Sequence, residues 1–208
     1  MSHRFDDLAP MFPDQNPFST WAVRPGAIVF RFVNGSSRES VLTKLEENGW
    51  WGEVVGPHGS GKSTLLATLA PGFEERGRTV KRYVVKLGEK QLAINTLELR
   101  KWTPNTQVVV EGFEKLGRRN RKMIETVCKR QQAGLLVTCH ESLGFPALLQ
   151  TSISLELGIS LVRDLLPPDC DFISDDDVRR SYERHRHNLR ELLFEMYDLY
   201  EKRRPRDG

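Results

Sequence analysis

One stretch of nine residues constrains the fold of this chain more than any other. It runs from Gly56 to Thr64 as GPHGSGKST, with the spacing G-x-x-x-x-G-K-S. A short apolar run, residues 51–55, precedes it, and residues 65–70 follow it with helix formers and an apolar face. We therefore expect a buried strand, a glycine loop and a helix in immediate succession.

The residue types in this stretch are those of the phosphate-binding loop known as Walker A. Glycines let the backbone turn and approach phosphate oxygens, and the loop amides with the following helix N-terminus form an anion-binding nest. Lys62 is expected to bring positive charge to the β- and γ-phosphates, and Ser63 to ligate Mg²⁺. His58 is assigned no catalytic role. The predicted nucleotide-binding residues are Gly56, Pro57, His58, Gly59, Ser60, Gly61, Lys62, Ser63 and Thr64.

A second apolar run ends in an acidic residue, which is the form of Walker B. Residues 108–110 are all valine, and Glu111 follows them 49 positions after Lys62. A carboxylate in this place holds Mg²⁺ directly or through water. The usual residue there is Asp, and Glu is one methylene longer. Glu114 is predicted to polarise the attacking water; the alternative is a solvated loop carboxylate.

Residues 134–140 form another buried strand that ends in polar side chains. Ligands of open α/β sheets bind at the carboxyl ends of the strands. If this strand lies beside the strand of residues 107–111, Thr138 or His140 points toward the γ-phosphate. For His140, a structural hydrogen bond in a loop is the alternative.

Between these two strands lies a cluster of basic residues on a predicted helix, comprising Arg118, Arg119, Arg121 and Lys122. Such a run is usually a solvated helix face. The sharper alternatives are a contact with nucleic acid or an arginine finger that reaches the γ-phosphate of a neighbouring subunit. The second of these would require a homo-oligomer.

The other segments predict three parts. Residues 1–35 form an extended arm, because of its prolines, and a first strand with alternating apolar residues at 28–32. Residues 36–142 form the nucleotide-binding core, which begins with a helix that Ser36 and Glu39 cap and has a helix break at Pro71-Gly72. Residues 143–208 look helical, and Ser174 caps one long final helix.

Composition excludes few classes of protein but narrows the setting. The chain has 208 residues and a net charge of +3, so its total charge forces no polyanion partner. The three cysteines, Cys128, Cys139 and Cys170, fit neither a zinc pattern nor a complete disulfide framework. With no apolar signal core and no apolar run of membrane-spanning length, we expect a cytoplasmic protein with no membrane contact.

Together these motifs resemble the P-loop ATPases of the additional-strand class, which includes the AAA+ and signal-transduction (STAND) ATPases. The resemblance covers roughly residues 50–200, and the whole chain also resembles small bacterial ATP-binding proteins. By this resemblance, residues 136–140 are similar to the sensor-1 strand, and residues 187–191 look like the segment of a helical lid. It implies that Arg190 reaches the nucleotide as the sensor-2 arginine. His187 stands where that segment often has glycine, and no ABC-type signature lies between the two motifs.

The expected fold is thus α/β, a three-layer α/β/α P-loop NTPase with a parallel sheet and a small C-terminal helical lid. The expected function is MgATP binding with slow ATP hydrolysis, coupled to lid movement, in a switch or motor that acts on a protein or nucleic acid. ATP and Mg²⁺ are the expected cofactors, and the expected catalytic residues are Lys62, Glu111, Glu114 and Arg190, with Ser63 and Glu111 at the metal. The alternatives are an adaptor that binds nucleotide without turnover, which Glu111 favours, and a small-molecule kinase, for which no acceptor site is visible.

Overall fold

The computed structural model describes residues 16–33, 35–186 and 188–205. These residues form two compact units. Residues 29–152 make the first, called here the sheet unit, and the described parts of residues 1–28 and 153–208 make the second, called the helical unit. Both ends of the chain therefore contribute to the helical unit.

The sheet unit is built on five parallel strands in the order β2-β3-β4-β1-β5. Their bounds are β1 Trp51–Val55, β2 Thr79–Val84, β3 Thr106–Glu111, β4 Gly134–Cys139 and β5 Ala147–Gln150. Strands β3 and β4 are buried along their whole length, which is why they read as continuous apolar runs. Because β4 lies between β1 and β3, the carboxyl ends of these three strands meet at one edge of the sheet.

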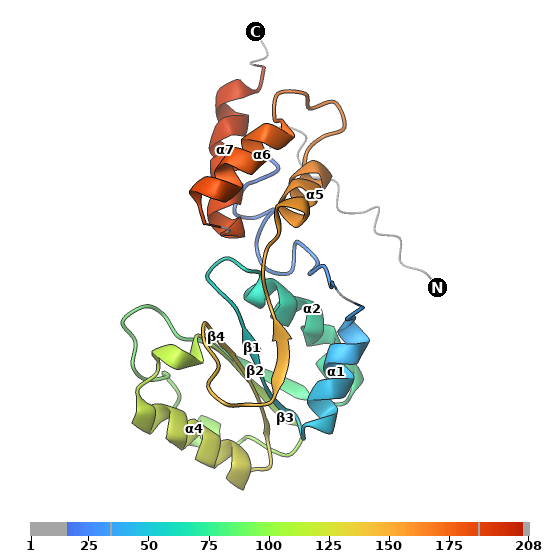
Figure 1. Ribbon diagram of the computed structural model, residues 1–208. Helices are drawn as coiled ribbons and strands as arrows, with labels where there is room; N and C mark the ends of the chain where they lie inside the picture. Colours follow the sequence, from blue (N-terminus) through green and yellow to red (C-terminus); the bar gives the residue numbers. More distant parts are fainter. Residues whose placement is uncertain (1–15, 34, 187, 206–208) are drawn as a thin grey trace. The chain divides into compact units, whose positions relative to one another are not determined.

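Helices cover both faces of the sheet and complete three layers (Figure 1). On one face lie α1 (Arg38–Glu47) and α2 (Lys62–Glu75), whose leucines pack on Val54, Val109 and Leu136. On the other lies α4 (Arg118–Arg130), with Ile124 and Cys128 against the opposite side of β3 and β4. The short α3 (Thr96–Leu99) and the 3₁₀ turn η2 (Phe113–Lys115) complete this unit. The predicted three-layer α/β/α fold is confirmed.

The helical unit contains α5 (Leu155–Leu165), α6 (Asp175–Arg184) and α7 (Leu189–Arg203). Its core joins these helices to Phe18, which has no exposed surface. A helical C-terminal part was predicted. The prediction that a single long helix follows Ser174 was wrong, because two helices, α6 and α7, lie there. Helix α6 ends at Arg184, and a second helix, α7, begins at Leu189. Between them Arg186 takes a positive φ of 50°, and Asn188 caps α7 through its side chain.

The predicted strand at residues 28–32 was also wrong. Residues 28–32 form no strand, and Ile28 makes an isolated bridge with Pro25. The Phe30 N–H donates to the side chain of Thr68 at 3.0 Å, where a strand would donate to a neighbouring carbonyl. Phe30 and Phe32 pack against the core under α2, so their alternation reflects burial against helices.

The predicted helix break at Pro71-Gly72 does not occur, and α2 continues to Glu75. Continuation buries Phe73 completely. Gly72 faces α1 so closely that a Cβ there would lie 2.2 Å from Leu42 Cδ1. Helix α1 begins one residue later than predicted, with Ser37 and Ser40 as the capping box in place of Ser36 and Glu39.

Residues 143–150 were predicted to belong to the helical part, yet they include strand β5. Leu148 packs over Gly52 of β1, where a Cβ would approach its Cγ to 2.6 Å. The missing side chain of Gly52 thus makes room for an edge strand that is rich in leucine. In the described part of the chain, no helix is long and apolar enough to cross a membrane.

Candidate functional site

The glycine-rich stretch forms a tight loop between β1 and α2. Its last residue before the helix, Gly61, has a φ of 89°, which glycine adopts without strain. Gly56 lies against the end of β5, and a Cβ there would be 2.2 Å from Thr151 Oγ1. Ser60 Oγ meets the same hydroxyl at 2.6 Å. The loop therefore requires small residues at its base and is tied to β5.

The backbone amides of this loop are arranged as a helix N-terminus. Within the described residues, the N–H groups of Gly59, Gly61, Lys62 and Ser63 donate to no protein acceptor. Unpaired amides at the start of a helix, together with the helix dipole, favour an anion. This is the geometry that binds phosphate groups.

Lys62 lies over the same loop. Its Nζ donates to the carbonyl oxygens of Gly56 and, at 2.8 Å, of Pro57. Burial lowers the pKa of this amine from its ordinary value, and Glu114 partly offsets that effect. The lysine charge therefore stands beside the amides that favour an anion.

The end of β3 meets the start of α2 through a short hydrogen bond. Ser63 Oγ donates to Glu111 Oε2 at 2.5 Å. The other carboxylate oxygen accepts from Arg82 Nε of β2 at 2.6 Å. Glu111 is buried, so its charge is compensated by these two partners. The turn after it is held by Thr138 of β4, whose Oγ1 accepts from the Gly112 N–H at 3.1 Å.

Glu114, His140 and His58 come together from three different segments. His140 Nδ1 lies 3.3 Å from Glu114 Oε1, and the rings of His140 and His58 are 4.0 Å apart. Burial, with His58 next, lowers the pKa of His140, so its imidazole is neutral at pH 7. Among the described residues, Glu114 Oε2 is buried without a hydrogen-bond partner. One oxygen of this carboxylate thus lies beside His140, and the other has no protein partner among the described residues.

The oxygen donors at this edge fit Mg²⁺ better than a transition metal. The hydroxyl of Ser63 and the carboxylate of Glu111 are hard ligands of the kind that Mg²⁺ takes, with water and substrate phosphates supplying the rest. In the described ranges, no group of three or more His, Cys, Asp or Glu is placed to hold a metal alone.

Arg190 is not among the residues that the sheet unit brings together. It lies in the first turn of α7, in the helical unit, where its N–H donates to Asn188 Oδ1 at 3.1 Å. Its predicted contact with a nucleotide stays a prediction. His187, the neighbouring departure from the lid pattern, lies outside the described residues.

Two charged residues of this region were missed by the sequence reading. Arg82 looks like an ordinary exposed residue of a strand, and only the pairing of β2 with β3 brings it to Glu111. Glu53 is buried within β1, where it accepts from Ser142 Oγ and, at 2.8 Å, from the Leu143 N–H. Glu53 thereby anchors the loop after His140. A carboxylate inside a buried strand was the available signal for it.

Comparisons were made with family models, curated proteins and solved structures. No family model and no curated protein matches the chain. One similar solved structure is that of PCH-2 from C. elegans, with 12% identity, a TM-score of 0.40 and coverage of 80% of this chain. The chain spans 65% of the length of that structure's chain. At this identity and TM-score, the match carries no argument about function.

Proposed function

We propose that this chain binds MgATP at the glycine loop and hydrolyses it slowly, as a switch or motor whose helical unit moves as a lid. The order of the strands supports a P-loop ATPase of the additional-strand class, because β4 separates the loop-bearing β1 from the acidic end of β3. An ATPase of this class works mainly by positioning and by charge stabilisation.

One observation carries the proposal, namely the hydrogen bond of 2.5 Å between Ser63 Oγ and Glu111 Oε2. The two residues are separated by 48 positions in the sequence. They meet at the mouth of an amide nest, directly beside Lys62. A chance glycine loop would have no reason to place a hydroxyl and a carboxylate together at its helix start.

Each residue of this edge has a role in the proposed reaction. The loop amides and Lys62 would neutralise the triphosphate, while Ser63 and Glu111 would hold a magnesium ion, which would supply positive charge beside the phosphates. Glu114 orients the attacking water through its unpartnered oxygen. His140 lies beside the other oxygen of Glu114, with its Nδ1 3.3 Å from Oε1. Arg190, from the lid, reports the γ-phosphate.

The proposal is tested by ATP binding and steady-state hydrolysis with Mg²⁺, for wild type and Lys62→Ala. We expect nucleotide binding and turnover in wild type and loss of both in the variant, because the lysine charge beside the amides is removed. The same assay with GTP compares the two bases. A wild-type protein that binds neither nucleotide would contradict the proposal.

The second candidate function is an adaptor that binds ATP without turnover. Glu111 favours it, because the usual residue at this position is Asp and the side chain of Glu is one methylene longer. Turnover that rises in Glu111→Asp would support the adaptor.

Glu114→Gln separates the two candidates. For an ATPase, we expect kcat to fall about 100-fold or more, the usual contribution of a general base, with ATP affinity unchanged. For an adaptor, the variant and wild type behave alike in both assays.

The basic cluster on α4 is the surface on which a partner is most readily tested. Arg118, Arg121 and Lys122 line a hollow together with Glu125, Phe113 and Leu143, so three of its residues are basic and one is acidic. If the partner is a nucleic acid, changing Arg118, Arg119 and Arg121 to Ala should weaken binding and flatten its salt dependence. If wild type binds no nucleic acid at low salt, a nucleic-acid partner is excluded and a protein partner becomes the candidate.

A further inference from the structure

The residue that the sequence reading overlooked at this site is Arg82, and its contacts assign it a task. Both Nε and one terminal nitrogen of its guanidinium lie on the same carboxylate oxygen, Glu111 Oε1, at 2.6 and 2.5 Å. Ser63 takes the opposite oxygen, Oε2, at 2.5 Å. The carboxylate is thus held from two sides, by β2 and by the start of α2.

The length of the Glu111 side chain explains why contacts on both of its oxygens would be needed. A glutamate side chain has one more rotatable bond than an aspartate, so a buried glutamate at a metal site needs more support to keep one orientation. Strand pairing places Val84 opposite Glu111, and Arg82 two residues earlier on the same face of the sheet. From there the long arginine side chain reaches the carboxylate.

We propose that Arg82 is a positioning residue for Mg²⁺, which turns Glu111 so that Oε2 faces the metal position beside Ser63. This inference rests on the proposed MgATP site and adds to it a second charged group from β2. Arg82 touches neither the nucleotide nor the metal in this role. It acts only through Glu111, and its effect on nucleotide binding is therefore confined to binding that depends on magnesium.

The test measures binding of a fluorescent methylanthraniloyl-ATP as Mg²⁺ is titrated, and again in EDTA. For Arg82→Ala we expect the half-saturating Mg²⁺ concentration to rise about tenfold, the lower range for loss of a residue that orients a metal ligand. Affinity for the nucleotide in EDTA should not change. Arg82→Lys should restore part of the loss, because it keeps a donor and the charge.

The matched control is Lys81→Ala, which removes one positive charge from the neighbouring exposed position of β2. If the loss of any positive charge on β2 were enough to weaken magnesium binding, Lys81→Ala and Arg82→Ala would shift the Mg²⁺ dependence alike. We expect Lys81→Ala to behave as wild type, because its side chain leaves the sheet on the other face.

A double-mutant cycle with Glu111→Asp makes the mechanism specific. The shorter aspartate withdraws from the guanidinium, so Arg82→Ala should change the Mg²⁺ dependence of Glu111→Asp by less than about twofold. Thermal unfolding in EDTA gives a readout without nucleotide. Arg82→Ala should lower the midpoint in the wild-type background more than in Glu111→Asp.

The two proposals fail in different ways. If wild type binds no MgATP, both are overturned. If wild type binds MgATP through Lys62 but Arg82→Ala leaves the Mg²⁺ dependence unchanged, or acts equally in the Glu111→Asp background, only the role of Arg82 is overturned.

Discussion

At the scale of single residues, the site depends on which ionisable groups carry charge. Buried Glu111 is compensated by Arg82 and Ser63, whereas His140 is kept neutral by burial and by its neighbour His58. The two imidazoles are 4.0 Å apart, so two positive charges there would repel each other. His140 therefore lies between His58 of the glycine loop and Glu114.

This arrangement predicts a loss of stability in mild acid. The pKa of His140 is lowered in the fold from its ordinary value of 6.5, so the unfolded chain binds the proton more readily. The contribution of neutral His140 to the free energy of unfolding is complete above pH 6.5. It declines as the pH falls from 6.5 toward the lowered pKa of the folded state. Glu114, Lys62, Lys115 and His58 are the charged or titratable groups that face this imidazole.

Urea unfolding of wild type and His140→Gln between pH 7.5 and 5 measures the effect. The variant, which has no proton to bind at this position, should lose less stability than wild type over the range. Equal losses in both proteins would show that other groups cause the acid sensitivity.

At this scale, the prediction from sequence succeeded where a motif is contiguous. Residues 56–64 and Glu111 stand in strings whose order alone predicts a loop and the end of a strand. Arg82 and Thr151 reach the site through strand pairing across residues far apart in the chain, which no local pattern encodes. Contacts of this kind could be found only in the structure.

At the scale of elements, two helical glycines have opposite surroundings. Gly72 of α2 faces α1, and a Cβ there would lie 2.2 Å from Leu42 Cδ1 and 3.0 Å from an Arg38 nitrogen. Gly158 of α5 has room, since its Cβ would meet Leu192 at 3.6 Å. The prediction that α2 ends at Pro71-Gly72 was wrong. Proline and glycine are common at helix ends, but the sequence does not show that Gly72 is needed here for the close approach of α1.

These surroundings predict opposite effects for the same substitution. Gly72→Ala should cost about 1–3 kcal/mol through overpacking. Gly158→Ala should stabilise by roughly 0.5–1 kcal/mol, because alanine restricts the unfolded chain and fills ordinary contact space. Thermal or urea unfolding of both variants checks the signs, and a loss in both would contradict the room inferred at Gly158.

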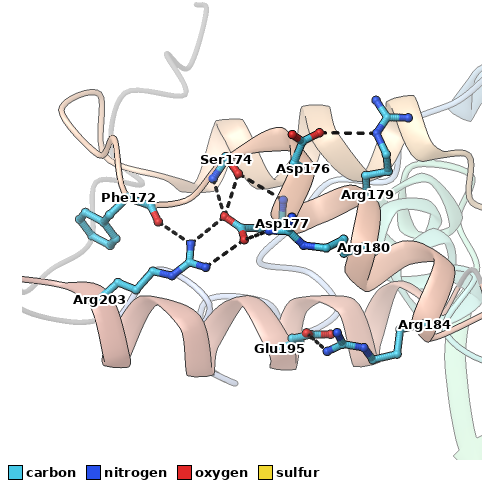
Figure 2. A network of polar contacts seen from close by, with 9 residues as sticks. All are labelled: Phe172, Ser174, Asp176, Asp177, Arg179, Arg180, Arg184, Glu195 and Arg203. Carbon is cyan, nitrogen blue, oxygen red and sulfur yellow. Dashed lines mark hydrogen bonds and ion pairs between the residues drawn. The ribbon is translucent and has the colours of Figure 1, made fainter.

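Helices α6 and α7 of the helical unit are joined by a polar network centred on Asp177 (Figure 2). This carboxylate, 4% exposed, forms ion pairs with Arg203 of α7 and Arg180 of α6 and accepts from the Ser174 N–H. Arg203 also donates to the Phe172 carbonyl at 2.8 Å. The hydrogen bonds from Arg203 are the main cause that holds the pKa of Asp177 well below its usual range.

Asp177→Asn should lower the free energy of unfolding by about 1.5–3 kcal/mol, the range for hydrogen bonds to a charged group, because Asp177 is buried but both arginine partners are exposed. In wild type, the contribution of Asp177 is complete above its ordinary pKa near 3.8 and is lost as the pH falls below that value. Urea unfolding at pH 7 and pH 3 measures both effects. The two proteins should differ less at pH 3, and an unchanged difference would contradict the role of the charge.

At the scale of the whole molecule, the two units differ in how the chain builds them. The sheet unit uses one continuous stretch, residues 29–152, whereas the helical unit draws on both sides of it. Asn16 donates from its side chain to the Tyr197 carbonyl and to Glu201, both at 2.9 Å. Phe18 packs edge-on against Tyr200, with ring centroids 6.2 Å apart. Division into parts by sequence order alone could not find this unit, because its halves share no sequence pattern.

Phe18→Ala should therefore destabilise helices that lie far away in the sequence. We expect a loss of about 3–5 kcal/mol for truncating a fully buried phenylalanine. Trp21→Ala is the control, since Trp21 is 54% exposed and should change stability by less than about 0.5 kcal/mol. Proteolysis within α7 under native conditions should increase in the first variant and not in the second.

The discontinuous helical unit also determines the order in which the molecule can be completed. During synthesis, Phe18 emerges early, but α7 follows only after all of residues 29–152 have been made. Closing so long an intervening segment costs entropy unless it is already compact. The two segments of the helical unit can therefore pack together only after the sheet unit has been synthesised. A chain stalled before Leu189 would hold a finished sheet and an uncovered Phe18.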